Sequence, residues 1–322
     1  MSSNSELMRK ADLAVSDLTS DGGLLNDEQA NTFIRKLLVQ PTVLRQARSV
    51  VMNAPTRQIN KIQFASRIMM PSPGSGVALD ADTSATNRRS KPTTEQITLT
   101  TKEVIAEVHL PYDVIEDNIE RGNIGLATDT GGSPVGGGLA TTIMTLIAER
   151  AALDLEELAL LGDSGSGDAY LALTDGWLKR MTSNVVDLSG AAISRGAFTD
   201  GMKALPSQYR RNRPALRHFV SHETELDYRE TIAQRETTGG DGMTQNLNPV
   251  FAAGSPVEGA ALMPATNGFL TNPMNLIWGI QRQIHVETDK DIRTREYIIV
   301  LTARVDFQLE EELATVRYNN IG

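Results

Sequence analysis

The chain has 322 residues, of which 40% are hydrophobic and 22% charged, so it is long enough for two compact domains and has the composition of a folded protein. It contains no cysteine, which excludes disulfide frameworks, thiolate nucleophiles and zinc sites built on sulfur. Its net charge of −9 argues against a protein that coats nucleic acid, because neutralising phosphates requires an excess of lysine and arginine.

The sequence shows no membrane or secretion signal. No stretch approaches the ~18 consecutive apolar residues of a membrane span, and Met1 to Lys10 lacks the hydrophobic core of a signal peptide. We therefore expect a protein that is made and kept in a cytoplasm. No internal repeat occurs at the period of a solenoid.

The first 40 residues predict a loose arm followed by a helix. Residues 1–23 are polar and flexible, which is typical of a segment that becomes ordered only on a partner. Apolar residues at helical spacing then predict a helix that Pro41 ends. The exposed side of this helix would carry Arg35 and Lys36.

The segment from Gln58 to Leu110 predicts the two strands of one hairpin. Apolar and polar residues alternate at both of its ends, and a change of phase between Thr101 and Val104 indicates a bulge or a bend. The connection, Met69 to Thr94, is far longer than the ~2–5 residues of an ordinary hairpin loop. Because an isolated two-stranded hairpin is marginal in water, we expect it to lie on an identical neighbour.

The longest predicted helix lies in the middle of the chain. A short helix over Tyr112–Ile119 and a glycine-rich hinge at residues 131–138 precede it. The long helix ends at Gly162 and places charged residues, Glu156 among them, away from its apolar stripe. The stripe consists of Leu139, Ile143, Ile147, Ala151, Leu155 and Leu158. With a rise of about 1.5 Å per residue, this helix spans roughly 35 Å, enough for the backbone of a domain.

Shorter elements alternate from about residue 181 onward. Ser194 is placed to cap a helix that Pro206 ends, and His218–Val220 predicts a buried strand leading into a second helix, Glu223–Gln234. The last fifty residues return to alternating apolar positions. They predict long strands around Ile284 and over Tyr297–Leu309, followed by a short one at Ala314, Val316 and Tyr318.

Several patterns resemble reactive sites, and each has a simpler explanation. Gly162 to Gly167 resembles the sequence around a protease nucleophile, which makes Ser164 a candidate, but the glycines follow a helix that they simply end. His218 and His222 have the spacing of metal ligands on a helix, whereas strand geometry would separate them. The run at residues 131–138 lacks the Gly-Lys-Ser/Thr of a phosphate-binding loop.

Two charged runs have similar explanations. The basic stretch from Tyr209 to Arg213 favours a solvated turn or an intersubunit salt-bridge site over nucleic-acid binding. The acidic run Glu310-Glu311-Glu312 is typical of a solvated strand end, where adjacent side chains point to opposite faces. We therefore predict no catalytic, cofactor-binding or metal-binding residues.

The order of these features carries a resemblance. The strongest matches are the segments Asn272–Ile284 and Tyr297–Asp306, the latter ending in Ala303-Arg304-Val305-Asp306. Weaker matches are Leu158–Asp163, Ala204–Pro206, Tyr209-Arg210, Gly254–Val257 and Met263-Pro264. Together with the long hairpin before the long helix, they make the chain resemble the major capsid proteins of tailed bacteriophages, which have the HK-ninety-seven-type fold.

The resemblance implies an α+β architecture with named parts. They are an N-terminal arm at 1–50, an extended hairpin called the E-loop at 51–108, a peripheral domain at 109–180 and 275–322 around the spine helix, and an axial domain at 181–274. The loop Thr237–Asn248 would lie near the centre of a ring of subunits. The implied function is self-assembly into pentamers and hexamers of an icosahedral virion shell around double-stranded DNA.

The resemblance also implies partners. Only a short arm precedes the fold, so we expect a separate scaffolding protein, together with a portal and in some cases a decoration protein. Lys91 is a possible donor of a covalent cross-link, but no acceptor pattern accompanies it, so assembly is expected to be non-covalent. The candidate intersubunit contacts are Arg35, Lys36, Arg67, Arg88, Arg89, Lys91, Arg210, Arg211 and Arg213.

Two alternatives remain open at this point. An encapsulin-type nanocompartment shares the fold and encloses enzymes, and a cargo enzyme encoded nearby would favour it. A serine hydrolase using Ser164 belongs to a different class, and labelling of that residue by a serine-directed probe would favour it.

Overall fold

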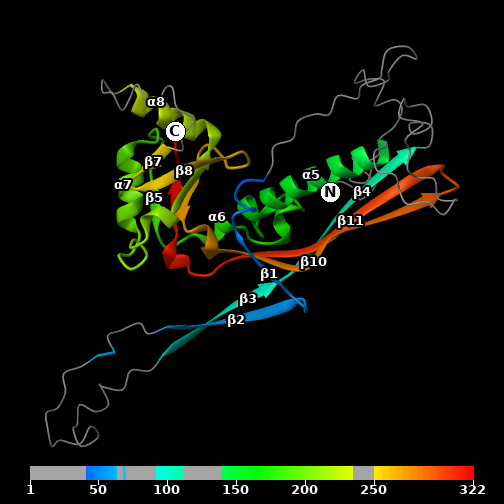
Figure 1. Ribbon diagram of the computed structural model, residues 1–322, viewed down its shortest axis with the longest axis horizontal. Coiled ribbons are helices and arrows are strands. Elements are labelled where there is room, and N and C mark those ends of the chain that lie inside the picture. Colours follow the sequence, from blue (N-terminus) through cyan, green and yellow to red (C-terminus); the bar gives the residue numbers. More distant parts are fainter. Residues whose placement is uncertain (1–40, 64–67, 70–91, 112–138, 235–249) are drawn as a thin grey trace, which may run out of the picture.

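The computed structural model describes residues 41–63, 68–69, 92–111, 139–234 and 250–322. Two bodies lie side by side, one built on a four-stranded sheet and one on a six-stranded sheet, and a two-stranded ribbon extends from them (Figure 1). Helices and sheets are mixed within both bodies, which confirms the predicted α+β class.

The four-stranded sheet contains the two longest strands. Its order is β1 (Arg48–Val51), β10 (Leu276–Asp291), β11 (Glu296–Leu309) and β4 (Lys102–Pro111). The strand β1 runs parallel to β10, and the other pairs are antiparallel. The register between β10 and β11 shifts twice, on either side of Arg282. Such bulges bend a strand and increase its twist.

The predicted long helix is α5 (Leu139–Leu161), which covers one face of this sheet (Figure 1). Ile147 and Ala151 pack against the sheet residues Leu110, Ile299 and Leu301. Farther along the helix, the leucines at 155, 158 and 160 enter a larger core that also contains side chains of the six-stranded sheet. The helix therefore packs against both bodies, whereas the sequence predicted it as the backbone of one domain.

Gly162 ends α5 for a steric reason. A Cβ atom at this position would lie 2.3 Å from the carbonyl oxygen of Thr174 and 2.6 Å from that of Leu158. The chain then continues through η2 (Leu171–Leu173) and α6 (Trp177–Arg180). The indole N–H of Trp177 donates to the carbonyl of Gln308 at 3.1 Å, which fixes this connection to β11.

The six-stranded sheet carries two helices on one face. Both predicted N-caps are present, since Ser194 Oγ accepts from the N–H of Ala197 at the start of α7 (Arg195–Ala204) and Ser221 Oγ accepts from Thr224 at the start of α8 (His222–Ala233). The ring of Phe198 packs edge-on against Tyr228, so the helices share one core. The strand order is β5 (Val185–Asp187), β12 (Val316–Asn319), β9 (Gly268–Thr271), β6 (Arg217–Ser221), β8 (Ser255–Ala260) and β7 (Val250–Ala252).

The C-terminal strand lies in a different body from the one expected. The prediction places residues 275–322 in the peripheral domain, but β12 pairs with β5 and β9 in the six-stranded sheet, where it is second from the edge. Tyr318 is fully buried there, and its hydroxyl lies 3.0 Å from Nδ1 of His218. The connection runs through η5 (Glu312–Ala314), a change of sheet that alternation alone does not reveal.

The predicted hairpin exists, but its second strand is shorter than expected. The ribbon consists of β2 (Thr56–Gln63) and β3 (Thr93–Thr100), paired in antiparallel register from Thr56 opposite Thr100 to Gln63 opposite Thr93. The assignment of Val104–Leu110 to the same hairpin is wrong, because these residues belong to β4 and pair with β11. The predicted change of phase marks the point where the chain passes from one sheet to the other.

Some predicted elements lie outside the described residues. They are the arm and its helix, the helix Tyr112–Ile119, the run at 131–138 and the loop Thr237–Asn248. Among the helices in the described part of the chain, none is long and apolar enough to span a membrane.

Candidate assembly surfaces

The ribbon is attached to the four-stranded sheet by a small apolar cluster at its root. Met52, Leu99 and Ile277 are buried together there. Gly279 allows the close approach, since a Cβ atom at this position would lie 3.1 Å from Sδ of Met52. Away from the root the ribbon is exposed, and the side chain of Ile62 is 66% exposed. The root therefore belongs to the body, whereas the rest of the described ribbon has little core of its own.

Asp306 fixes the end of the ribbon to the body. Its side chain is on β11 and the residue is 3% exposed. One carboxylate oxygen accepts from the N–H of Thr100 at 2.7 Å, and the other accepts from the hydroxyl of Thr174 at 3.0 Å and the N–H of Phe307 at 2.9 Å. Burial raises the pKa of Asp306, although these hydrogen bonds act in the opposite direction. One acid thus connects β3, β11 and the segment after α5.

The acidic run at 310–312 makes more contacts than a solvated strand end would. Glu310 pairs with Arg48 at 2.9 Å, and Glu311 pairs with Lys61 of the ribbon. Glu312 accepts hydrogen bonds from the backbone and hydroxyl groups of both Thr182 and Ser183. Adjacent carboxylates therefore hold three different segments, so the prediction of simple solvation is wrong.

Glu156 is also placed differently from the prediction. It was expected on a polar side of the long helix, yet it is 1% exposed. Its Oε1 accepts from the N–H groups of Thr42 at 2.9 Å, Val43 at 2.6 Å and Leu44 at 3.3 Å, and its Oε2 accepts from Thr42 at 3.1 Å. The carboxylate therefore caps the first turn of the described chain and fixes it to α5.

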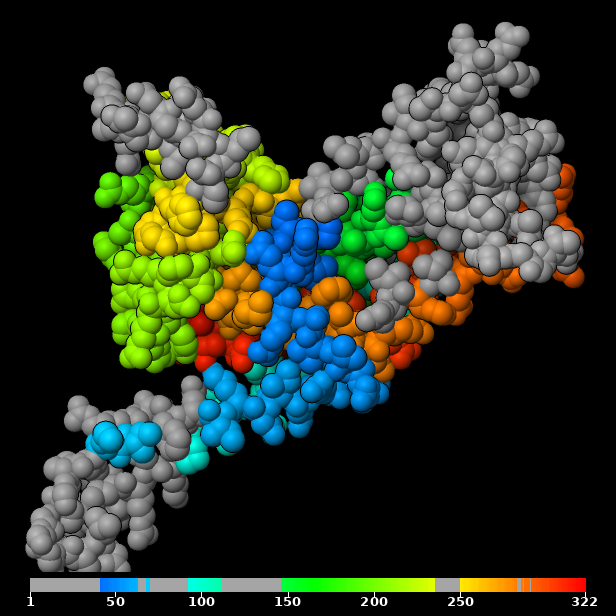
Figure 2. All heavy atoms as spheres, viewed as in Figure 1, coloured from blue at the N-terminus to red at the C-terminus, as the bar shows by residue number. Residues whose placement is uncertain are grey.

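From this turn the chain crosses the surface toward the ribbon. Residues 41–60 form a continuous blue band across the face of the molecule in Figure 2. Gln46 contacts the six-stranded sheet by donating from Nε2 to Glu258 at 2.6 Å. Farther along, β1 pairs with β10 of the four-stranded sheet. This segment thus touches both bodies before it enters the ribbon.

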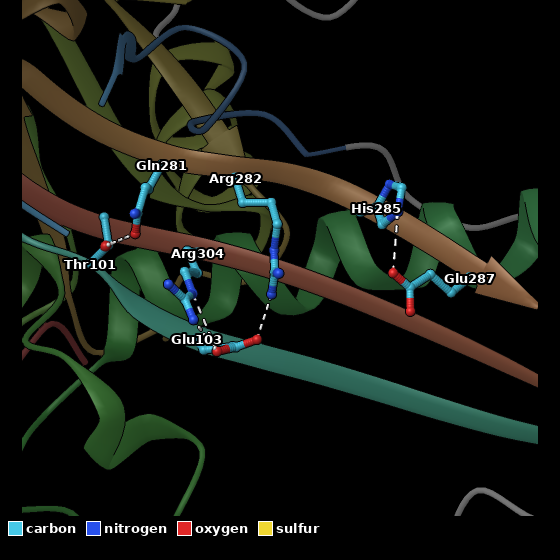
Figure 3. A network of polar contacts seen from close by, with 7 residues as sticks. All are labelled: Thr101, Glu103, Gln281, Arg282, His285, Glu287 and Arg304. Atoms are coloured by element: carbon cyan, nitrogen blue, oxygen red, sulfur yellow. Dashed lines mark hydrogen bonds and ion pairs between the residues drawn. The ribbon is translucent and has the colours of Figure 1, made fainter. Parts of the chain in front are cut away.

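A group of charged side chains lies beside the two bulges of β10. Arg282 and Arg304 occupy paired positions on β10 and β11, and both contact the carboxylate of Glu103 on β4 (Figure 3). Hydrogen bonds from Arg304 and Arg282 lower the pKa of Glu103. His285 and Glu287 form a second contact farther along β10, at 3.3 Å. All five side chains are partly exposed, so this group is a candidate surface for a neighbouring molecule.

The nine arginine and lysine residues predicted at interfaces divide into two sets. Six lie outside the described residues, namely Arg35, Lys36, Arg67, Arg88, Arg89 and Lys91. Arg210, Arg211 and Arg213 lie together in the turn between α7 and β6, part of which is η3 (Arg213–Ala215). None of these three pairs with a described carboxylate, which leaves their charges available to another molecule.

The patterns that resembled reactive sites have structural partners. The N–H of Ser164 donates to Asp175 at 2.9 Å within the turn after α5. His218 lies in the core beside Tyr318, where burial lowers its pKa to about 4, whereas His222 begins α8 and packs against Gly259. In the described part of the chain, no group of three histidine, aspartate or glutamate residues is arranged to hold a metal ion.

A comparison with known proteins identifies the family. No protein-family model matches the chain. The chain is 42% identical over 327 residues to YqbE of Bacillus subtilis strain 168, whose name describes a prophage capsid protein, and the match covers 98% of this chain and 97% of the relative. The chain belongs to the family of phage capsid proteins. It is therefore a structural protein of the virion shell and not an enzyme.

Solved structures show the same fold at low sequence identity. The capsid of the native GTA particle matches with a TM-score of 0.65 and 15% identity, covering 96% of this chain and 100% of that chain. The satellite phage P4 procapsid, which includes a size determination (Sid) protein, matches with a TM-score of 0.60 and 14% identity, covering 100% and 98%. Microbacterium phage Oxtober96 matches with a TM-score of 0.63 and 12% identity, covering 95% and 98%. The HK-ninety-seven-type capsid fold suggested by the sequence is confirmed.

Proposed function

We propose that this capsid protein assembles as pentamers and hexamers that close into an icosahedral shell around double-stranded DNA. The observation that carries the proposal is the ribbon β2–β3. It extends away from the body (Figure 1), and most of the side chains on its strands are exposed. A two-stranded ribbon without a core is marginal in water, so a neighbouring subunit is the surface that completes it.

Each part of the chain then has a role in assembly. The proposed parts are the arm, the ribbon as E-loop, the peripheral body around α5, and the axial body around the six-stranded sheet. The observed pairings favour ending the E-loop near Thr100 and assigning β12 to the axial body. Many copies of modest contacts would add up to a stable shell. Once one contact holds a subunit in the shell, its remaining contact surfaces are at a high effective concentration relative to their partners.

We further propose that the shell confines DNA without binding it strongly. The chain is acidic, with a net charge of −9, and strong contacts repeated over hundreds of copies would oppose movement of DNA during packaging and ejection. A separate scaffolding protein and a portal are the proposed partners during assembly in the host cytoplasm, and a decoration protein is a further one. The fold similarity to the satellite phage P4 procapsid, which includes a size determination protein, supports an additional assembly partner.

The test is to purify the full chain and examine it by size-exclusion chromatography and negative-stain microscopy, alone and co-expressed with the products of the genes that flank its own. We expect rings or closed shells in at least one of the two preparations. Monomers alone in both preparations, at concentrations up to those reached in an infected cell, would overturn the proposal.

A further inference from the structure

The turn before β6 carries an unpaired cationic surface, which we call the basic turn and define as Arg210, Arg211 and Arg213. Arg211 and Arg213 are exposed, and none of the three forms an ion pair with a described acidic side chain. The Nε atom of Arg210 is buried and has no hydrogen-bond partner within the described part of the protein. The exposed guanidinium groups of Arg211 and Arg213 are therefore the ones that carboxylates of another molecule can reach.

The helix α8 carries an anionic surface of matching size. Glu223, Asp227 and Glu230 are exposed at positions i, i+4 and i+7, which lie on one side of a helix. None of them pairs with a described cation, in contrast to Glu225, which pairs with Arg229 at 2.8 Å. We call Glu223, Asp227 and Glu230 the acidic face.

Each charged surface has an exposed apolar side chain nearby. Leu226 lies between Glu223 and Asp227 on α8 and is 60% exposed. Phe251 is 56% exposed on β7, and the turn from β7 to β8 contacts the basic turn, since Ser255 Oγ donates to the carbonyl of Arg213 at 2.8 Å. Covering the two surfaces with a neighbouring molecule would remove both apolar side chains from water.

The basic turn and the first turn of α8 lie at opposite ends of β6. The strand β6 begins at Arg217, directly after the basic turn, and ends at Ser221, directly before α8. Figure 1 shows α8 beside the six-stranded sheet, where it contacts β6 and β8. A single subunit therefore cannot bring its own basic turn onto the first turn of its own α8, whereas two subunits placed side by side can.

Complementary surfaces at opposite ends of one strand bind head to tail. Such heterologous contacts close into rings where the rotation between neighbouring subunits closes, as the proposed pentamers and hexamers require. We propose that in each capsomer the basic turn of one copy binds the acidic face of α8 on the next copy, with Leu226 and Phe251 between the charged pairs. This inference rests on the proposed assembly into pentamers and hexamers and names the surfaces that form the rings.

The test reverses the charge of each surface in the full chain. One variant carries Arg211→Glu and Arg213→Glu, a second carries Glu223→Arg and Asp227→Arg, and a third carries all four changes. The substituted residues are exposed, so each variant is expected to fold, which circular dichroism checks. Arg293→Glu, an exposed reversal in the turn between β10 and β11, is the control.

Head-to-tail binding makes a specific prediction for mixtures. Each two-residue variant alone should lose ring formation, because both of its surfaces then have the same sign. The four-residue variant should regain it. An equimolar mixture of the two-residue variants should form only rings with strictly alternating subunits, so six-membered rings appear and five-membered rings do not.

Two results would overturn the inference. One is ring formation at the wild-type level by either two-residue variant. The other is folded protein that fails to form rings in both the mixture and the four-residue variant while the control forms them. If the wild type and the control form no rings, the proposed function fails instead, so the two failures are distinguishable.

Discussion

Glu156 offers a sharp test of how the start of the described chain is held. Its carboxylate is buried against α5 and accepts hydrogen bonds from three successive backbone N–H groups, those of residues 42–44. Replacing Glu156 by alanine removes every one of these acceptors at once. Because Val43 and Leu44 are 0% and 4% exposed, water has little access to replace the lost partners.

The magnitude follows from the number of donors left unpaired. An unsatisfied buried donor costs about 1–3 kcal/mol, so the N–H groups of Val43 and Leu44 together cost about 2–6 kcal/mol. The alanine variant no longer buries a charged carboxylate, and this offsets part of the loss. We therefore expect Glu156→Ala to lower the free energy of unfolding by about 2–4 kcal/mol. Glu156→Gln keeps one acceptor oxygen, so its loss should be about 1 kcal/mol.

The assay is urea unfolding of unassembled subunits, followed by the fluorescence of the two tryptophans, the fully buried Trp177 and the partly buried Trp278. The matched control is Glu149→Ala, which removes an exposed glutamate from the same helix and should have a small effect. An unfolding midpoint for Glu156→Ala equal to that of Glu149→Ala would show that the buried carboxylate does not hold the turn.

Four further outcomes are expected. Leu155→Asp places a charge in the core and should give insoluble or unfolded protein, so a soluble variant that assembles normally would contradict the packing of α5. Deleting Ser72 to Lys91 should leave a folded subunit by circular dichroism that forms no stable shells by microscopy, and normal shells would contradict the role of the E-loop. Unassembled subunits should bind a short DNA duplex weakly and with a shallow salt dependence in fluorescence anisotropy, and a steep dependence would contradict the charge argument. Burial raises the pKa of Asp306, so the folded state holds that proton more tightly than the unfolded state, and the stability of the wild type relative to Asp306→Asn should fall as the pH rises from about 3.9 through the raised value. If the difference in unfolding free energy between the wild type and Asp306→Asn does not change over this pH range, the raised pKa of Asp306 is contradicted.

The elements that the sequence predicted best are those with a strong local signal. The stripe from Leu139 to Leu158 has the period of a helix, and the stop at Gly162 is set by backbone contacts that exclude a Cβ atom. The strands β10 and β11 alternate over many residues, which leaves little ambiguity. The change of sheet between β3 and β4 was visible only as a change of phase, because which strand pairs with which depends on contacts between distant residues.

The buried polar contacts were less accessible to prediction. Nothing adjacent to Glu156 in the sequence indicates that residues more than a hundred positions earlier supply its hydrogen-bond donors. The same holds for Asp306, whose partners come from two other segments. The basic turn was predicted as an intersubunit contact because its three arginines are close in sequence. The surface proposed to bind it, the acidic face of α8, could be identified only once the exposed side of that helix was known.

The position of β12 has a consequence for the timing of assembly. Because this strand lies between β5 and β9, the edge strand β5 has no partner in the six-stranded sheet until residues 316–319 have been synthesised. Tyr318, which fills the core beneath α7, arrives with it. Nascent chains therefore cannot complete the axial body before β12 has left the ribosome. Chains that terminate before β12 would fail to join a shell rather than be built into it as defects.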